Sequence, residues 1–144
     1  MNSDLIFQLC NNAALVSWML LIFFPKKKWV LITIPSVVVS LLCLLYSYLL
    51  LSSFSISDVQ RFSSLVGVTE LFKSPAAVLA GWVHYLAFDL LVGLYIVTNA
   101  TKHSISHWLC IPCLLFTFLA GPVGLLMFFI LKVSKTKTIL HSLN

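Results

Sequence analysis

Residues 76–98 decide the fold class, and they read AAVLAGWVHYLAFDLLVGLYIVT. The run holds 23 residues, and Asp89 is its one residue of an ionised type. About 20 helical residues cross the hydrocarbon core of a bilayer, which is about 30 Å thick. The stretch therefore predicts a helix that spans a membrane.

Three other apolar stretches have the same character, at residues 5–24, 29–51 and 108–131. The composition agrees, because 60% of the residues are hydrophobic, 9% are charged and the mean hydropathy is +1.05. A soluble domain carries about 25% charged residues, so soluble enzymes and coiled coils are excluded. We predict an all-α polytopic membrane protein, a four-transmembrane-helix bundle that forms one domain over residues 1–144.

Basic residues stand next to the ends of these spans. Lys26, Lys27 and Lys28 follow the first span, and Lys132, Lys135 and Lys137 follow the last. Lysines in such places anchor helix ends near lipid head groups, so we expect membrane lipids as partners and no nucleic acid. Four spans would put the two chain ends and residues 52–74 on one side, with five basic residues against four. That count leaves the orientation open.

Residues 52–74 are more polar than the spans. Ser57 and Gln60 have the spacing of a capping box, which predicts that a helix starts there. Oppositely charged pairs at i,i+3 spacing follow, namely Asp58 with Arg61 and Glu70 with Lys73. We predict a short interfacial helix between the second and third spans, at the membrane surface or against the bundle. Ser74 and Pro75 then have the character of an N-cap and a first helical residue.

Asp89 is the first candidate for chemistry, because a carboxylate in mid-membrane costs about 2.5–3.5 kcal/mol. It should therefore face other helices or a wet cavity. His84 lies five positions earlier, about 140° round the helix, so the two side chains are expected on different faces. Two interpretations stay open: a site in which these residues handle protons, or a hydrogen-bond clamp that holds the bundle together.

The depths of the polar residues suggest a pocket around helix 76–98. If neighbouring spans are antiparallel, Asn11 and Asn12 fall near the level of His84. Ser17, Ser40 and Thr117 then fall near the level of Asp89. The residues expected to line a substrate pocket are Trp82, Tyr85, Gly93, Asn11, Asn12, Thr117, Gly121, Pro122 and Gly124. The last three belong to a Gly-Pro-Val-Gly run that predicts a kink, which either serves packing or opens a groove.

No metal site is expected. His103, His107, Cys110 and Cys113 cover about 15 Å of helical rise, too much for one tetrahedral ion. The four cysteines of the chain do not have the regular loop spacing of a disulfide framework. Cys110 and Cys113 are therefore interpreted as packing residues.

Two motifs carry a resemblance to a known family. The run AGWVHYLAFDLLVG at residues 80–93 resembles one signature of the abscisic-acid-deficient-4-like, or neoxanthin synthase-like, family. The run LLFTFLAGPVGLL at residues 114–126 resembles its second signature. The resemblance implies a small four-helix integral membrane protein of a kind found in plants, algae and bacteria. Leu94 and Tyr95 depart from the Arg-Trp that members often carry at this place.

The resemblance also implies an activity, since plant members are implicated in making neoxanthin from violaxanthin. It suggests a membrane-embedded, cofactor-independent isomerase, or another modifying enzyme, that acts on a carotenoid or other isoprenoid lipid, with Asp89 as acid and His84 as base. The alternative is a non-catalytic binder of lipid or carotenoid, or an accessory subunit. Residues 5–24 lack the features of a secretory signal, and we expect no transit peptide before them. We expect a bacterial inner (plasma) membrane location, or a plastid membrane for a plant-type homologue; the oligomeric state is not fixed by the sequence.

Overall fold

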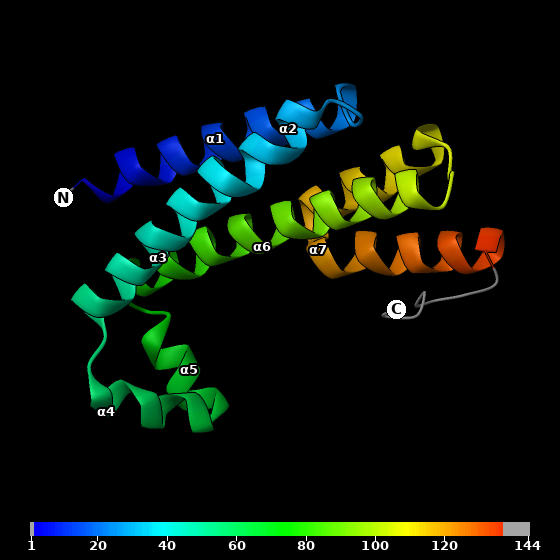
Figure 1. Ribbon diagram of the computed structural model, residues 1–144. Helices are drawn as coiled ribbons and strands as arrows, with labels where there is room; N and C mark the ends of the chain where they lie inside the picture. Colours follow the sequence, from blue (N-terminus) through cyan, green and yellow to red (C-terminus); the bar gives the residue numbers. More distant parts are fainter. Residues whose placement is uncertain (1, 137–144) are drawn as a thin grey trace.

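The computed structural model describes residues 2–136, except the side chain of residue 57, and the described chain is built of helices joined by short connections (Figure 1). Four helices are long and apolar enough to cross a membrane: Ser3–Phe23, Lys28–Ser53, Pro75–Lys102 and His107–Thr136. The predicted all-α architecture with four long apolar helices is thereby confirmed. The helix ends differ from the predicted ranges by a few residues.

The first helix, α1 (Ser3–Phe23), is capped at its start by Asn2. The Asn2 side-chain oxygen accepts hydrogen bonds from the backbone N–H groups of Asp4 and Leu5, at 3.1 and 3.4 Å. Such a cap satisfies donors that have no partner inside the helix. Pro25 follows the end of α1 and cannot continue a helical hydrogen-bond pattern, so the chain turns there.

The second span is one rod with a widened turn in it. It consists of α2 (Lys28–Thr33), the π-helix η1 (Ile34–Val39) and α3 (Ser40–Ser53). Pro35 has no N–H to donate, and a π-turn is a common way to absorb such a gap. The Ser40 hydroxyl donates to the Pro35 carbonyl oxygen at 3.1 Å, five residues back. Ser40 is exposed and does not face Asp89, although the sequence places the two at a similar depth.

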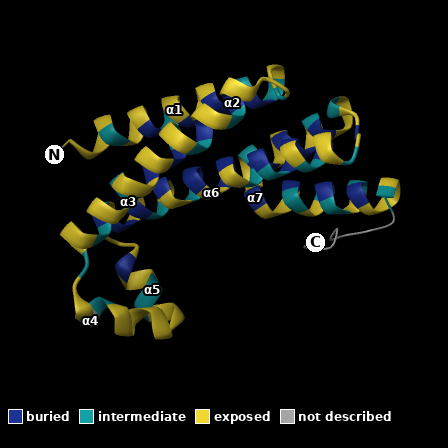
Figure 2. Cartoon of the chain, in the orientation of Figure 1, coloured by how far each residue is buried: buried dark blue, intermediate teal, exposed yellow. Residues whose placement is uncertain are grey.

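Helix α6 (Pro75–Lys102) is the centre of the bundle and packs against α1, α3 and α7 (Figure 1). Figure 2 shows buried residues recurring along it, whereas its neighbours expose much of their outer faces. Gly93 allows α1 to pack closely on α6, because a β-carbon at this position would collide with the Trp18 ring. The helix begins at Pro75 with Ser74 as N-cap, as predicted, although the Ser74 side chain makes no capping hydrogen bond.

Helix α7 (His107–Thr136) is broken at Ala120, whose φ of −155° and ψ of 55° are not helical. The chain reverses at this point, and the two halves of α7 run back along each other (Figure 1). A β-carbon on Gly124 would collide with the backbone N and hydroxyl of Thr117, seven residues earlier. In a continuous helix, seven residues are about 10 Å apart along the axis. The predicted kink is therefore a full hairpin.

A shared cavity confirms the reversal over the whole length of the hairpin. Leu109, Cys113, Met127 and Leu131 line one volume of about 390 Å³ with Pro112, Ile130 and Ser134. Residues so distant in sequence meet only if the halves are antiparallel. Each half covers about 20–24 Å, less than the hydrocarbon core.

A buried lysine ties the second half of the hairpin to α6. The ammonium of Lys132, which is 2% exposed, donates to the Asn99 side-chain oxygen at 3.2 Å. Asn99 lies near the C-terminal end of α6, so Thr136 lies at that end of the bundle too. The expectation that the end of α7 shares a side with the N-terminus is wrong for this reason. Lys137 lies outside the described residues.

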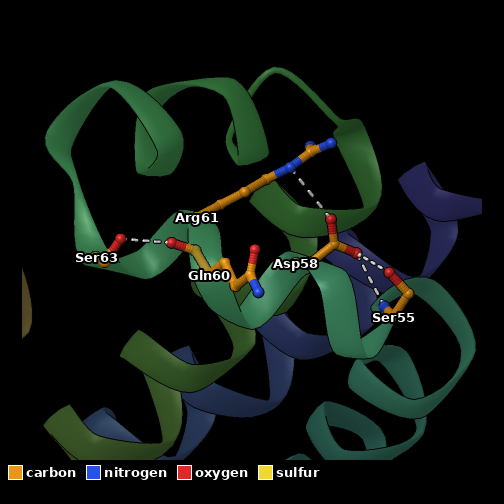
Figure 3. Close-up of polar contacts among 5 residues, drawn as sticks. All are labelled: Ser55, Asp58, Gln60, Arg61 and Ser63. Atoms are coloured by element: carbon orange, nitrogen blue, oxygen red, sulfur yellow. Dashed lines mark hydrogen bonds and ion pairs between the residues drawn. The ribbon is translucent and has the colours of Figure 1, made fainter.

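Between α3 and α6, three short helices replace the single predicted one: α4 (Ile56–Val59), the 3-10 helix η2 (Gln60–Ser63) and α5 (Leu65–Leu71). The predicted capping box at Ser57 and Gln60 is wrong. The box is formed two residues earlier, where the Asp58 carboxylate accepts from the N–H and the hydroxyl of Ser55, both at 2.9 Å (Figure 3). Asp and Glu both fill the third position of such a box, so a match by spacing alone chose the wrong serine.

Both predicted ion pairs of this segment are confirmed. The Arg61 Nε lies 3.5 Å from the Asp58 Oδ1, as Figure 3 shows, and the Lys73 Nζ lies 2.6 Å from the Glu70 Oε1. The same segment leaves apolar side chains exposed, namely Ile56, Val59, Phe62, Leu65 and Val66. Exposed apolar residues beside charged ones suit a segment that lies at the surface of a bilayer.

Candidate functional site

A cavity of about 360 Å³ lies between α1, α6 and the first half of α7. Its lining residues are Asn11, Asn12, Ala14, Leu15, Trp82, Tyr85, Leu86, Phe118 and Leu119. Two amides and one phenol are thus set in apolar walls, which is the usual composition of a ligand pocket. Leu15 and Leu119 are exposed at its rim, so the cavity opens on the outer, apolar face of the bundle.

Trp82 and Asn11 join two walls of this cavity. The indole N–H of Trp82 donates to the Asn11 side-chain oxygen at 2.7 Å. This bond places the two residues at one depth, and Figure 1 shows that α1 and α6 run in the same direction. The Trp82 ring lies 5.5 Å from the Tyr85 ring and 5.6 Å from the Phe7 ring, measured between centroids. Trp82 and Tyr85 form an aromatic wall of the cavity, and Phe7 packs on Trp82 outside it.

Tyr85 connects the cavity to the break in α7. Pro122 has no N–H, so the Phe118 carbonyl four residues before it loses its helical partner. The Tyr85 hydroxyl donates to that carbonyl oxygen at 3.4 Å. The same hydroxyl lies close to the backbone of Gly121 and to the carboxyl group of Asp89. It therefore stands between the cavity and the most buried acid of the described chain.

Asp89 lies one turn beyond Tyr85 on α6, and it is 7% exposed. Its Oδ1 packs against Gly121, where a β-carbon would collide with it. Its Oδ2 is buried and has no hydrogen-bond partner among residues 2–136. An unpartnered polar atom is costly in a bilayer interior, and such atoms mark places where a proton, a water or a ligand group completes the site.

His84 lies on a different face of α6, as the spacing indicates. It is exposed and packs between aromatic rings, with centroid distances of 4.5 Å to Phe88 and 5.2 Å to Tyr46 of α3. Asp89 instead faces α7. The structure does not bring His84 and Asp89 together around one ligand.

The other residues expected in the pocket have separate places. Gly93 packs on Trp18, and the Thr117 hydroxyl, which is fully buried, donates to the Cys113 carbonyl oxygen at 2.8 Å. Gly121 and Gly124 make the close contacts of the hairpin, and Pro122 is exposed. None of these residues lines the cavity. Ser17, which was placed near Asp89 in depth, donates to the Ala13 carbonyl oxygen at 2.8 Å.

No pattern in the sequence marks the apolar lining residues of the cavity. Ala14, Leu15, Leu86, Phe118 and Leu119 are ordinary residues of apolar spans, and only the packing of α1 against the hairpin selects them. Lys132 was interpreted as a helix-end anchor, although it is buried on Asn99. Asn99 is a polar residue near a helix end, and its position opposite Lys132 depends on the reversal at Ala120.

The candidate metal ligands do not converge. Within residues 2–136, no group of three or more His, Cys, Asp and Glu side chains is placed to hold an ion. The thiols of Cys110 and Cys113 face carbonyl oxygens one turn earlier, those of Ser106 and Leu109, at 3.6 and 3.8 Å. Both thiols thus stay inside their own helix.

Comparison with known proteins gives one result. Residues 5–128 match the family ABA4-like, described as ABA DEFICIENT 4-like. The match covers most of the chain and includes both motifs that carry the resemblance. No curated protein and no solved structure matches the chain.

Proposed function

Because the chain belongs to the ABA4-like family, we propose that it binds a carotenoid-like isoprenoid lipid in the cavity between α1, α6 and α7. The observation that carries the proposal is the cavity itself, which is apolar, opens on the outer face of the bundle and holds a few polar groups. A carotenoid is longer than this cavity, so its ring end would enter while the polyene stays in the lipid. The same proposal places the protein in a bacterial plasma membrane, or in a plastid membrane for a plant-type member.

The polar groups of the cavity match the polar groups of a xanthophyll ring. Asn11 and Asn12 offer amide donors and acceptors, and Tyr85 offers a hydroxyl at the inner end. A ring that carries a hydroxyl or an epoxide would exchange hydrogen bonds with them. The Trp82 ring supplies a flat apolar surface against which a carotenoid ring packs.

A second candidate function is an isomerase, and the unpartnered carboxyl oxygen of Asp89 favours it. A neutral carboxyl at Asp89 would protonate an epoxide oxygen through the Tyr85 hydroxyl as the C–O bond breaks. The C–H electron pair of the adjacent carbon would form the new double bond of an allene. The proton released would return to Asp89 by the same route, so no cofactor is needed. His84 has no role in this scheme because it lies on another face.

Co-expression in a host that accumulates violaxanthin tests both functions. Purification in mild detergent, followed by chromatography of the bound and total pigments, should show pigment bound to the protein. Leu119→Trp narrows the cavity rim and should reduce the bound pigment at least about tenfold. Leu126→Trp is the matched control, because Leu126 is also exposed on α7 but lies outside the cavity. A folded protein that retains no pigment contradicts the proposal.

Asp89→Asn separates the two candidate functions. The substitution keeps the size and the hydrogen-bonding capacity of the side chain but removes its acid. A binder should keep its pigment with this change. An isomerase should lose about 10²–10⁴ in conversion while the bound pigment is unchanged. Conversion that persists in the variant excludes Asp89 as the acid.

A further inference from the structure

A second cavity, of about 450 Å³, lies at the end of the bundle opposite the N-terminus. It lies between the turn after α1 and the turn between α6 and α7. Its lining residues are Pro25, Lys26, Val97, Ala100, Thr101, Ser104, Ile105, Ser106, His107 and Trp108. None of these residues lines the cavity described above.

The position of this cavity corresponds to the boundary between lipid and water. α1 and α6 both end there, and α2 and α7 both begin there. Trp108, at 81% exposure, and the exposed Trp29 mark the same level on the outside of the bundle. Exposed tryptophans gather at the level of the head groups in membrane proteins.

The charge at this end has one sign. Lys26, Lys27, Lys28, Lys102 and Lys135 are exposed here, and Lys132 is buried nearby. The acidic residues of the described chain lie elsewhere: Asp4, Asp58 and Glu70 are at the opposite end, and Asp89 is at mid-depth. A positive potential at a membrane surface attracts anionic head groups, by about 1 kcal/mol per Lys or Arg.

Three polar groups of the cavity are free to bind a ligand, whereas the Thr101 hydroxyl donates to the Val97 carbonyl oxygen at 2.9 Å. Within residues 2–136, the Lys26 ammonium and the hydroxyls of Ser104 and Ser106 make no side-chain hydrogen bond or ion pair. His107 is fixed differently, because its Nε2 must donate to the Ile22 carbonyl oxygen at 2.8 Å. Ser104 has a φ of 54°, in the left-handed region. Strained backbone of this kind concentrates at functional sites.

We propose that this cavity binds the phosphate of an anionic lipid head group. Lys26 would pair with the phosphate, and the hydroxyls of Ser104 and Ser106 would donate hydrogen bonds to its oxygens. The start of the acyl chains would pack on the apolar side of the cavity, which is formed by Val97, Ala100 and Ile105. This inference does not depend on the proposed carotenoid function.

Binding of defined lipids to the purified full chain tests the site. The chain in neutral detergent is titrated with short-chain phosphatidylglycerol, with phosphatidylcholine and with inorganic phosphate. Thermal stability and native mass spectrometry report the binding. We expect phosphatidylglycerol to bind at least about tenfold more tightly than phosphatidylcholine, with an affinity that falls as salt rises. No preference between the two lipids overturns the proposal. If inorganic phosphate binds tightly and phosphatidylglycerol does not, the site binds free phosphate and the lipid proposal is overturned.

Two variants and one control locate the binding. Lys26→Gln removes the cation, and Ser104→Asp puts a carboxylate into the cavity at a backbone conformation that Asp tolerates. Each should remove most of the preference for phosphatidylglycerol. Lys135→Gln removes an exposed charge at the same end but outside the cavity, and it should change the affinity by less than about twofold. Equal losses in Lys26→Gln and Lys135→Gln show general surface attraction and overturn the site.

Discussion

The carboxyl group of Asp89 on α6 occupies the space that Gly121 leaves open at the tip of the α7 hairpin. The size of the side chain at each of these two positions limits the size of the side chain at the other. A side chain at position 121 would push the carboxyl away, and a longer acid at position 89 would push the hairpin away. The buried acid and the reversal of the chain therefore form one structural unit.

This relationship predicts an interaction energy between the two positions. Gly121→Ala should lower the free energy of unfolding by about 1–3 kcal/mol, because the new methyl group collides with Oδ1. In an Asp89→Ala background the same change should cost less, with a coupling of at least about 0.5 kcal/mol. Thermal unfolding of the four proteins in detergent measures the cycle. Val123→Ala, on an exposed neighbour, is the control for general effects on the hairpin. Additive costs would show that Gly121 and Asp89 are not coupled.

The hairpin predicts the orientation of the chain in the membrane. The end that includes the turn after α1 carries six basic residues of the described chain, namely Lys26, Lys27, Lys28, Lys102, Lys132 and Lys135. The other end carries two, Arg61 and Lys73. Because positive residues favour the cytoplasmic side, we expect the lysine-rich end in the cytoplasm.

Labelling of single cysteines checks this orientation. In a variant without the four native cysteines, Lys26→Cys and Ser134→Cys should react with a membrane-impermeant maleimide from the same side. Ser3→Cys and Ser63→Cys should react from the opposite side. All four positions are exposed, so a lack of reaction from one side reports topology rather than burial. Labelling of positions 134 and 3 from one side would mean that α7 crosses the membrane and would contradict the hairpin.

Lys132 and Asn99 should respond unequally to substitution. Asn99→Leu leaves the buried ammonium without its acceptor and should cost about 2 kcal/mol of stability or more. Lys132→Met removes the charge and keeps most of the apolar stem, so it should cost less. The double variant should be more stable than Asn99→Leu alone. Thermal unfolding in one detergent ranks the three proteins. A double variant less stable than Asn99→Leu would show that the Lys132–Asn99 hydrogen bond does not stabilise the fold.

The capping box between α3 and α6 predicts a loss of structure in acid. The N–H and the hydroxyl of Ser55 donate to Asp58, and with the nearby Arg61 they hold the pKa of that carboxyl below its usual value. A lowered folded-state pKa contributes stability that is fully present above the unfolded value of about 3.9. That stability is lost as the pH falls through the lowered folded-state pKa. Hydrogen exchange over residues 56–63 should therefore lose protection only below about pH 4.

Asp58→Asn is the matched control for this effect. It removes the titrating group and should remove the acid dependence of protection in this segment. An unchanged dependence in the variant would assign it to another residue.

Much of the fold follows from the sequence because lipid imposes one simple requirement. Each long apolar stretch had to become a helix, and residues 76–98 indicated this without any knowledge of their neighbours. The parallel course of α1 and α6 also follows from alternating spans, and it explains why Asn11 meets Trp82. Trp82, Tyr85 and Asp89 lie three and four residues apart, so helical spacing alone puts them on one face of α6.

The reversal in α7 was not predictable from its own residues. A Gly-Pro-Val-Gly run interrupts a helix, but the same run is compatible with a kink and with a hairpin. The difference depends on contacts between distant residues. Tyr85 binds the carbonyl that Pro122 leaves without a partner, and Gly124 allows the two halves to touch at Thr117. Neither contact has a signal in the local pattern, so both the depth of α7 and the shape of the cavity depend on tertiary packing.

The break at Ala120 also bears on the order in which the chain is assembled. Neither half of α7 is long enough to be threaded across the bilayer as a stop-transfer segment, and the backbone at the turn is left with polar groups that lipid does not solvate. α6 supplies the Tyr85 hydroxyl that satisfies one of them, so we expect the hairpin to be stable only when α6 is already in place. We therefore expect the chain to insert in two stages, with α1, the second span and α6 crossing the membrane before the hairpin of α7 forms. On this expectation the hairpin enters the bilayer from the lysine-rich end, and the segment up to Thr136 stays on that side.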